Sequence, residues 1–358
     1  TAPGFVRFSG STIKRSLEPL LALLGEILSE PSLPEQELAQ LKRESLAALL
    51  ELTDSDQSLV STHFRRALYR GHPYGRTSLG TRRSFDAITL DHVKARYQQG
   101  FARTGRVVGF AGDVTHEEAA ALVQKYLASP SGAAFARTKP PEPEMPKGRH
   151  LRIVDKPERT QTQIQIGRMG THPHDADHAA LVVGNAVFGG AFTARLMRAV
   201  LSERGWSYGA SSRLAIDRVR EAWSMWTFPA ATDAVPCIAL ELELMQTWVE
   251  QGISEEELAF AKSFLIKSHA FAVDTADKRL EQAMEVWLYD LPRDYFSGYT
   301  KHIEEVSVEQ VNRALKARLA PDDLVLAVVA TESEIGAALR NLPGLTSTEV
   351  VAFDADAS

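Results

Sequence analysis

The chain has 358 residues, of which 44% are apolar and 24% charged, and this composition can fill the cores of two globular domains. Its formal net charge of −6 argues against a nucleic-acid partner, which needs a basic face for the phosphate backbone. The single cysteine, Cys237, excludes an internal disulfide, and no apolar run reaches the roughly 18 residues that would suggest a membrane span.

Apolar residues recur at helical spacing through the first hundred residues, and they predict helices over 16–29, 35–53, 57–69 and 91–99. Pro34 precedes the second helix and is suited to its first turn. The apolar run 106–111 predicts a buried strand. Thr115 and Glu118 then carry the signature of a capping box, which predicts a helix over 116–127.

A proline-rich stretch, 139–148, follows and predicts an extended, semi-rigid connector. Beyond it the pattern predicts strands over 151–154, 162–167, 207–214 and 222–228, and helices over 175–188, 193–203, 235–250, 254–271 and 278–288. A last helix near 306–311 and a last strand near 325–329 follow. This mixture of antiparallel strand pairs and long helices indicates an α+β fold, with helices packed mainly on one face of a sheet.

The chain repeats itself at a nearly constant spacing. The segment that starts at Pro34 recurs at Ser254, an offset of 254 − 34 = 220, and the segment at Ile88 recurs at Val306, an offset of 306 − 88 = 218. Collinear matches of this kind indicate a duplicated domain. We therefore expect a first domain over 1–138, a linker over 139–148 and a homologous second domain over 149–358. The counterpart of Gly148 would fall at 148 − 220 = −72, so the first domain is expected to lack its N-terminal part.

Three segments carry a family resemblance: Phe-Gly-Gly-Ala-Phe-Thr-Ala-Arg-Leu-Met over 188–197, Glu-Arg-Gly-Trp-Ser-Tyr-Gly over 203–209, and His-Pro-Tyr-Gly over 72–75. They resemble the pitrilysin/insulinase (M16) metallopeptidases, in particular bacterial M16B-like chains that are non-catalytic subunits or inactive domains. The resemblance implies two homologous domains that face each other across a peptide chamber. Active members bind zinc through His-x-x-Glu-His and a glutamate on a later helix.

The sequence departs from the catalytic pattern of that family. It contains no His-x-x-Glu-His, and the later glutamate would fall at Ala47 or Ala48, whose methyl groups cannot bind a metal. Glu44 and Glu51 lie about one helical turn away from that place. We therefore expect no catalytic residue and no metal on this chain, with zinc on a partner chain or on the missing N-terminal segment.

The substrate-binding residues implied by the resemblance centre on Tyr208, which matches the family tyrosine. The arginine expected seven residues earlier is replaced by Leu201, and Arg198 and Arg204 are the nearest arginines that could take its place. The expected substrate-binding set therefore comprises Tyr208, Arg204, Arg198, Gly189 and Gly190, although the two glycines also suit a tight turn. A structural metal at His172, His174 and His178 is the weaker alternative to a loop that starts a helix.

The resemblance implies a non-catalytic subunit that helps to enclose and position a peptide or unfolded protein for a partner bearing His-x-x-Glu-His. Such a chain would form a heterodimer with a catalytic M16 chain, or a homodimer. Two alternatives stay open: an active zinc endopeptidase whose metal-binding segment is absent here, and a structural assembly core without peptide handling. A bacterial source is expected, with periplasm and cytoplasm both open as compartments.

Overall fold

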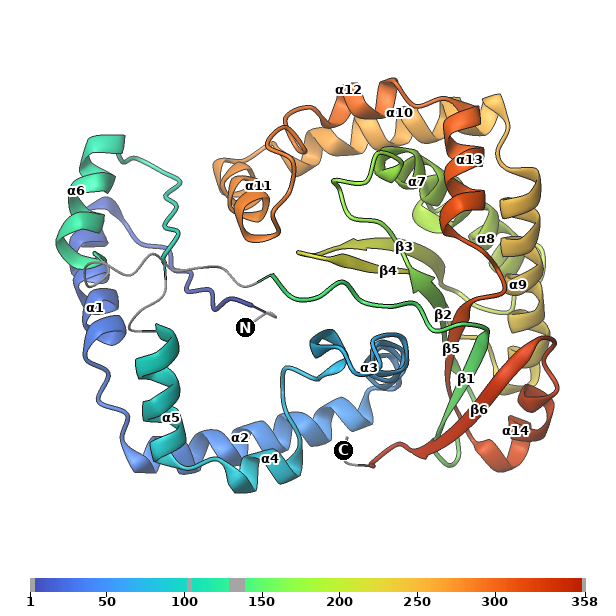
Figure 1. Ribbon diagram of the computed structural model, residues 1–358, viewed down its shortest axis with the longest axis horizontal. Coiled ribbons are helices and arrows are strands. Elements are labelled where there is room, and N and C mark those ends of the chain that lie inside the picture. The colour runs from blue at the N-terminus through green and yellow to red at the C-terminus, as the bar shows by residue number, and fades with distance from the viewer. Residues whose placement is uncertain (1–3, 102–104, 129–138, 356–358) are drawn as a thin grey trace.

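The fold is built around one six-stranded mixed sheet with helices on both faces (Figure 1). The computed structural model describes residues 4–101, 105–128 and 139–355. The strands are β1 (Arg149–Asp155), β2 (Gln163–Met169), β3 (Ala210–Ile216), β4 (Arg220–Thr227), β5 (Leu324–Ala330) and β6 (Leu345–Ala352). Their order across the sheet is β3-β4-β2-β5-β1-β6, so every described strand belongs to the second half of the chain.

The centre of the sheet is the strand β5, which pairs with β1 in parallel and with β2 in an antiparallel ladder. On the outer sides β2 and β3 both pair antiparallel with β4, and β6 pairs in parallel with β1. All seven residues of β5 are buried, as expected for a strand whose two faces are both covered. A strand covered on both faces needs apolar side chains at successive positions, and this explains the unbroken apolar sequence of β5.

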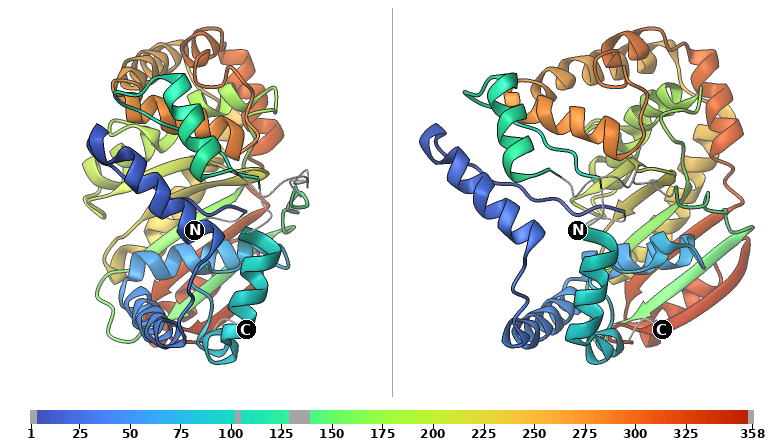
Figure 2. Two further views of the ribbon diagram at one scale, coloured as in Figure 1. Left: turned by 90° about the vertical axis from the view of Figure 1, so that its left-hand side faces the viewer. Right: turned by 60° about the vertical axis from the view of Figure 1, so that its left-hand side comes forward.

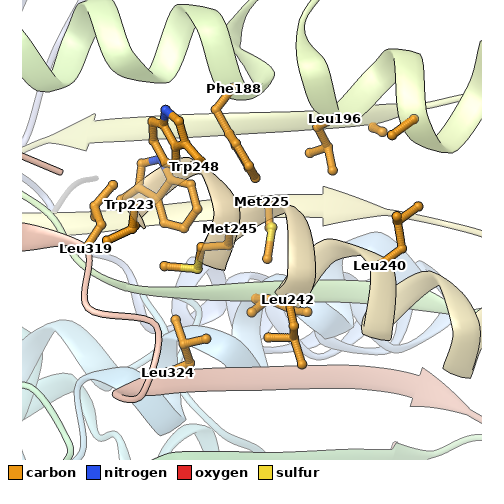
Figure 3. Close-up of a cluster of buried hydrophobic side chains, with 14 of the residues drawn as sticks. Phe188, Leu196, Trp223, Met225, Leu240, Leu242, Met245, Trp248, Leu319 and Leu324 are labelled. Atoms are coloured by element: carbon orange, nitrogen blue, oxygen red, sulfur yellow. The ribbon is translucent and has the colours of Figure 1, made fainter. Parts of the chain in front are cut away.

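One face of the sheet is covered by helices of the second half of the chain. These are α7 (His178–Asn185), α8 (Arg195–Met197), α9 (Ala234–Gln251), α10 (Glu255–Ala272), α12 (Tyr299–Glu304), α13 (Val308–Arg318) and α14 (Glu332–Arg340). Their core holds Phe188, Trp223 and Trp248 in mutual contact, with ring centroids 4.5 Å apart for Phe188 and Trp248 (Figure 3). This aromatic cluster joins α9 and the π turn Ala186–Gly190, which follows α7, to strand β4.

The opposite face is covered by a helix from the first half, α3 (Asp56–Leu68), which packs on β1, β2 and β5. Its residues Leu59, Val60, Phe64 and Leu68 are fully buried. The expectation of helices mainly on one face is therefore incomplete. The sheet needs cover on both sides because β5 carries apolar side chains on both of its faces.

The other helices of the first half are α1 (Leu17–Ser29), α2 (Glu35–Asp54), α4 (Arg82–Ala87), α5 (Leu90–Arg96) and α6 (His116–Tyr126). The helix α11 (Ala276–Leu288) belongs to the second half. Short turns extend or precede several helices: 3₁₀ turns at Lys14–Ser16, Pro73–Gly75 and Ala231–Asp233, and π turns at Tyr97–Phe101, Ala186–Gly190 and Arg198–Ser202. Helices α1 and α6 lie side by side in every view (Figures 1 and 2).

Most of the predicted elements are confirmed. The capping box of Thr115 and Glu118 is formed at the start of α6, and the linker 139–148 has neither helix nor strand. Pro34 lies at the N-cap of α2, one residue before its first turn. The ends of the expected first domain, 1–3 and 129–138, lie outside the described residues.

The predicted strand over 106–111 is wrong. A strand is stabilised by a ladder of hydrogen bonds to a neighbour, and no described strand lies beside this segment. It runs instead against α11, so closely that a side chain at Gly109 would come within 2.4 Å of Leu280. The helices α4, α12 and α14 and the strand β6 were not predicted.

One helical stretch of the described chain, His178–Ser202, is long and apolar enough to cross a membrane by length and composition alone. In the fold 61% of its most apolar window is buried, as in the core helix of a globular domain. The stretch therefore has a packing role that accounts for its composition.

Candidate functional site

The two glycines of the 188–197 segment lie where α7 widens into the π turn Ala186–Gly190 and approaches strand β3. A side-chain carbon at Gly189 would lie 2.6 Å from the hydroxyl oxygen of Ser212 and 2.7 Å from its backbone nitrogen. At Gly190 it would lie 2.9 Å from Nδ2 of Asn185. Glycine is therefore required for this close packing, which is the turn role that the sequence also allowed.

The side chain of Asn185 connects this turn to the sheet through hydrogen bonds. Its Oδ1 accepts hydrogen bonds from the Ser212 hydroxyl at 2.7 Å and from Nε1 of Trp223 at 2.9 Å, and its Nδ2 donates to the Ser212 carbonyl at 3.3 Å. The amide thus links α7 to both β3 and β4. Sequence reasoning missed Asn185, because a single asparagine inside an apolar helix carries no motif.

Tyr208 lies in the turn just before β3, and hydrogen bonds of the neighbouring Ser207 fix the backbone of this turn. Ser207 is buried, and its Oγ donates to the Gly209 carbonyl at 2.7 Å and accepts from the Phe228 amide at 3.1 Å. A side chain at Gly209 would clash with the Phe228 ring at 2.6 Å. Tyr208 itself is 84% exposed, so the backbone is fixed while the phenol projects into solvent.

The two candidate arginines flank Glu203, just before this turn. Arg204 Nη1 lies 3.2 Å from Glu203 Oε2 and donates to the Ala199 carbonyl at 3.1 Å, while its guanidinium lies 5.4 Å from the Trp206 ring centroid. Arg198 Nε lies 3.9 Å from the other oxygen of Glu203. In the described chain neither guanidinium hydrogen-bonds to Tyr208 or stacks on its ring. The structure therefore places the three residues on one stretch without joining them directly.

A shallow depression lies beside the glycine turn, between α7, β3 and α10, with a volume of about 180 Å³. Its wall is formed by Val182, Asn185, Ala186, Gly190, Ser212, Arg213, Leu214 and Leu265. Among the described strands, β3 is an edge strand and β4 is its one neighbour. Exposed edges offer unpaired backbone groups to an added strand. The depression thus combines apolar and polar side chains from α7 and α10 with residues 212–214 of β3.

The comparison with known sequences decides the family. The family described as the peptidase M16 inactive domain matches residues 87–265, which is half of the chain. The chain belongs to the M16 peptidase family. Its match is to the inactive domain, which supports a non-catalytic M16-like protein.

The relatives of this M16 protein include a non-peptidase homolog and proteins named as uncharacterized zinc proteases. The non-peptidase homolog YmxG of Helicobacter pylori is 24% identical over 324 residues, covering 90% of this chain and 74% of the relative. An uncharacterized zinc protease of Mycobacterium bovis is 23% identical and covers 78% of this chain. The M16 chain spans only 65% of that relative's length.

Solved structures agree with the sequence comparison. The peptidase M16 inactive domain from Pseudomonas fluorescens matches with a TM-score of 0.75 at 28% identity, covering 87% of this chain and 74% of that one. A protease from Helicobacter pylori matches with a TM-score of 0.79 over 89% of this chain and 78% of that one, and at 14% identity it shows the fold alone. The M16 fold is therefore shared over most of the described residues.

Within the described residues no group of three or more His, Cys, Asp and Glu side chains could hold a metal. Ala47 and Ala48 lie within α2, away from its ends. The nearby Glu44 accepts a hydrogen bond from Gln40 at 2.8 Å. These side chains supply no metal-ligand set.

The histidines near residue 175 have structural partners instead. Both ring nitrogens of His178 are engaged, with Thr171 Oγ1 at 3.0 Å and the Tyr295 hydroxyl at 3.1 Å. Burial lowers the pKa of His178 to about 4, so the ring is neutral at physiological pH. Asp175 is held by both nitrogens of the Arg220 fork, which leaves it unsuited to a metal. The cluster fixes the start of α7, as the loop-to-helix interpretation expects.

The His-Pro-Tyr-Gly segment over 72–75 joins the two halves of the chain. His72 Nε2 lies 2.9 Å from the Pro141 carbonyl of the linker, and the Tyr74 hydroxyl donates to Asp217 at 2.6 Å. Just before it, the Tyr69 hydroxyl donates to Glu221 at 2.5 Å. Asp217 and Glu221 lie at the end of the β3–β4 hairpin opposite to the Tyr208 turn. This segment therefore anchors the hairpin that presents Tyr208.

Proposed function

We propose that this chain is the non-catalytic partner in an M16-type zinc peptidase, where it encloses and positions an extended peptide or unfolded protein. The catalytic chain would carry His-x-x-Glu-His and the zinc, as a heterodimer partner. The observation that carries the proposal is the exposed Tyr208 on a rigid turn at the start of β3, which is an edge strand among the described strands. An edge strand binds extended peptides through main-chain hydrogen bonds, and neighbouring side chains add selectivity.

The arrangement of helices supports the duplicated architecture that such a chamber needs. Helices α2 and α3 start at residues 35 and 56, and α10 and α11 start at 255 and 276, so both pairs differ by 220. The starts of α5 and α13 differ by 308 − 90 = 218, and those of α6 and α14 by 332 − 116 = 216. The same helix order thus recurs in both halves, in keeping with domains over 1–138 and 149–358.

The faces of α3 and α11 support the same conclusion. Val60, Phe64 and Leu68 are buried under the sheet, and at an offset of 220 they correspond to Leu280, Met284 and Leu288 of α11. Helix α11 has no buried residue among those described, although it carries the same apolar pattern. The segment 106–111, which corresponds to β5, runs along α11 as β5 runs along α3. We therefore propose that α11 covers a second, homologous sheet in the assembled enzyme.

The test uses this chain mixed with a catalytic M16 chain from the same source, with cleavage of a fluorogenic peptide as the readout. We expect Tyr208→Ala to weaken kcat/KM about tenfold or more, because a positioning contact is lost without loss of the fold. Val350→Ala is the matched control, since Val350 is an exposed side chain on β6 at the opposite edge of the sheet. Unchanged kcat/KM in Tyr208→Ala would refute the proposal. Cleavage by this chain alone that a chelator abolishes would also refute it.

A structural assembly core is the second candidate, favoured by Leu201 and by the engagement of both arginines with Glu203. In that case Tyr208→Phe and Tyr208→Ala both leave the partner's activity intact. Under the peptide-positioning proposal, Tyr208→Phe lowers activity through loss of the hydroxyl while Tyr208→Ala lowers it further. The two variants therefore separate the candidates.

A further inference from the structure

The strand β6 forms the edge of the sheet opposite to β3, on the side of β1 that faces away from β5 (Figure 1). It pairs in parallel with β1, and a register shift interrupts this ladder only at its start, where Arg149 faces Leu345 and His150 faces Ser347. From Ser347 to Ala352 the pairing is regular. The proposed peptide-positioning function uses no residue of this strand.

The outer side of β6 carries unpaired backbone groups. Alternate residues of an edge strand direct their N–H and C=O groups away from their single neighbour. Outside the ladder with β1, no described residue forms a backbone hydrogen bond with residues 347–351. These groups are therefore available to another strand.

The sequence of β6 lacks the usual protection of an exposed edge. Natural edge strands carry lysine, proline or a bulge that prevents pairing with another chain. The regular part of β6 reads Ser-Thr-Glu-Val-Val-Ala, with three β-branched residues and neither lysine nor proline. Its one charge, Glu349, forms an ion pair with Arg152 of β1 at 2.9 Å. Val350 is 43% exposed, so this edge presents an apolar side chain to solvent.

A second copy of β6 can meet this edge only in a few antiparallel registers. Residues that lie directly opposite in an antiparallel pair share one face of the sheet, so a two-fold axis must pass beside a residue and not between two residues. An axis at Glu349 would bring two carboxylates directly opposite each other, which is unfavourable. An axis at Thr348 would pair Val350 with Thr346, where the ladder with β1 is irregular.

An axis at Val350 avoids both problems. Val350 then meets Val350 of the second copy, Glu349 meets Val351, and Thr348 meets Ala352. No two like charges face each other, and the two exposed valine side chains cover one another. Cross-strand pairs of β-branched residues stabilise a sheet.

We infer that two copies of this chain associate through their β6 strands, antiparallel about Val350, so that the two six-stranded sheets become continuous. One pair of edge strands buries less surface than a standard interface, and we therefore expect a dimer Kd in the micromolar range. The pairing leaves β3 and Tyr208 unaltered at the opposite edge of each sheet. It is therefore independent of the peptide-positioning proposal.

Sedimentation velocity of the full chain over a range of concentrations measures the association, and Val350→Glu and Val350→Lys test its register. Because residue 350 meets itself across the axis, either variant alone places two like charges opposite each other and should raise the dimer Kd at least about fivefold. An equimolar mixture of the two variants places opposite charges there. The mixture should form the dimer at concentrations where each variant alone is a monomer, which also shows that both variants are folded.

Thr348→Glu is the matched control, at an exposed position on the same strand and the same face. Its carboxylate would meet Ala352 of the second copy, so the Kd should change less than about twofold. The inference is overturned if the unmodified chain stays a monomer throughout the micromolar range, or if Val350→Glu and Val350→Lys each dimerise as the unmodified chain does. A mixture that stays monomeric, or a loss of dimer in Thr348→Glu as large as in Val350→Glu, would overturn the register at Val350.

Discussion

Glu241 is fully buried in the core between α9 and the sheet, and it is the residue whose chemistry can be tested most directly. Both of its carboxylate oxygens lack a hydrogen bond within the described chain. Burial raises its pKa from 4.5 to about 8, and the nearby Thr227 hydroxyl opposes this shift only slightly. The carboxyl group is therefore protonated in the folded protein at neutral pH.

The direction in which stability changes with pH follows from the difference between the pKa of Glu241 in the folded chain and its pKa in the unfolded chain. Above pH 4.5 the unfolded chain releases this proton, whereas the folded chain keeps it until about pH 8. The contribution of Glu241 to stability is thus full below pH 4.5 and falls as the pH rises to 8. Each pKa unit corresponds to about 1.4 kcal/mol, so the total loss is (8 − 4.5) × 1.4, or about 5 kcal/mol. Between pH 6.5 and 8 the loss is about 2 kcal/mol.

The assay compares urea unfolding of the unmodified chain and of Glu241→Gln at pH 6.5 and pH 8. We expect the unmodified chain to lose about 2 kcal/mol more than Glu241→Gln over this interval, because glutamine does not titrate. The buried histidines His63 and His178 have lowered pKa values and lose stability as the pH falls below 6.5, so they act mainly outside this window. Glu243→Gln, at an exposed position of α9, should behave like the unmodified chain. Equal pH dependence in all three proteins would refute the reasoning.

Two further predictions concern the packing around the candidate site. Gly189→Ala should lower the free energy of unfolding by about 1–3 kcal/mol, because the new methyl group would overlap Ser212. Chemical denaturation measures this free energy, and an unchanged midpoint of unfolding would contradict the close approach of Gly189 to Ser212. Tyr74→Phe should cost about 1–3 kcal/mol at pH 7 by removing the hydrogen bond to the half-buried Asp217, whose pKa is raised mainly by desolvation. The cost should shrink at acidic pH, where a protonated Asp217 no longer needs the donor, and a cost that stays constant with pH would contradict this role.

The sequence predicted the helices well because their signals are local. The capping box of α6 and Pro34 before α2 lie within a few residues of the helix starts that they define. The predicted strand over 106–111 was wrong because an apolar run indicates that a segment is buried, but not that a neighbouring strand pairs with it. Strand β6 was missed for the opposite reason, since it is a largely exposed edge strand that lacks a continuous apolar pattern.

The candidate site was predicted only in part. The resemblance located Tyr208 and the glycine turn, but not Asn185, whose hydrogen bonds reach residues 27 and 38 positions away along the chain. Glu241 carried a weak signal, as a charged residue on the same helix face as Ile238, Met245 and Trp248. Nothing local marked the burial of His63, because its surroundings are assembled from α2, α3 and the chain after β6.

The central position of β5 has a consequence for biosynthesis. Strands β1 and β2 are made early, yet their shared neighbour begins at residue 324, which is 324 − 149 = 175 residues after the start of β1. At roughly 5–20 residues per second, the ribosome takes about 10–35 s to make this stretch. During that interval the apolar β1 and β2 lack their central partner, and α3 lacks the surface on which it packs. Strands β2, β3 and β4 can pair before β5 is made, but the sheet is completed, and α3 gains its packing surface, only when β5 joins it.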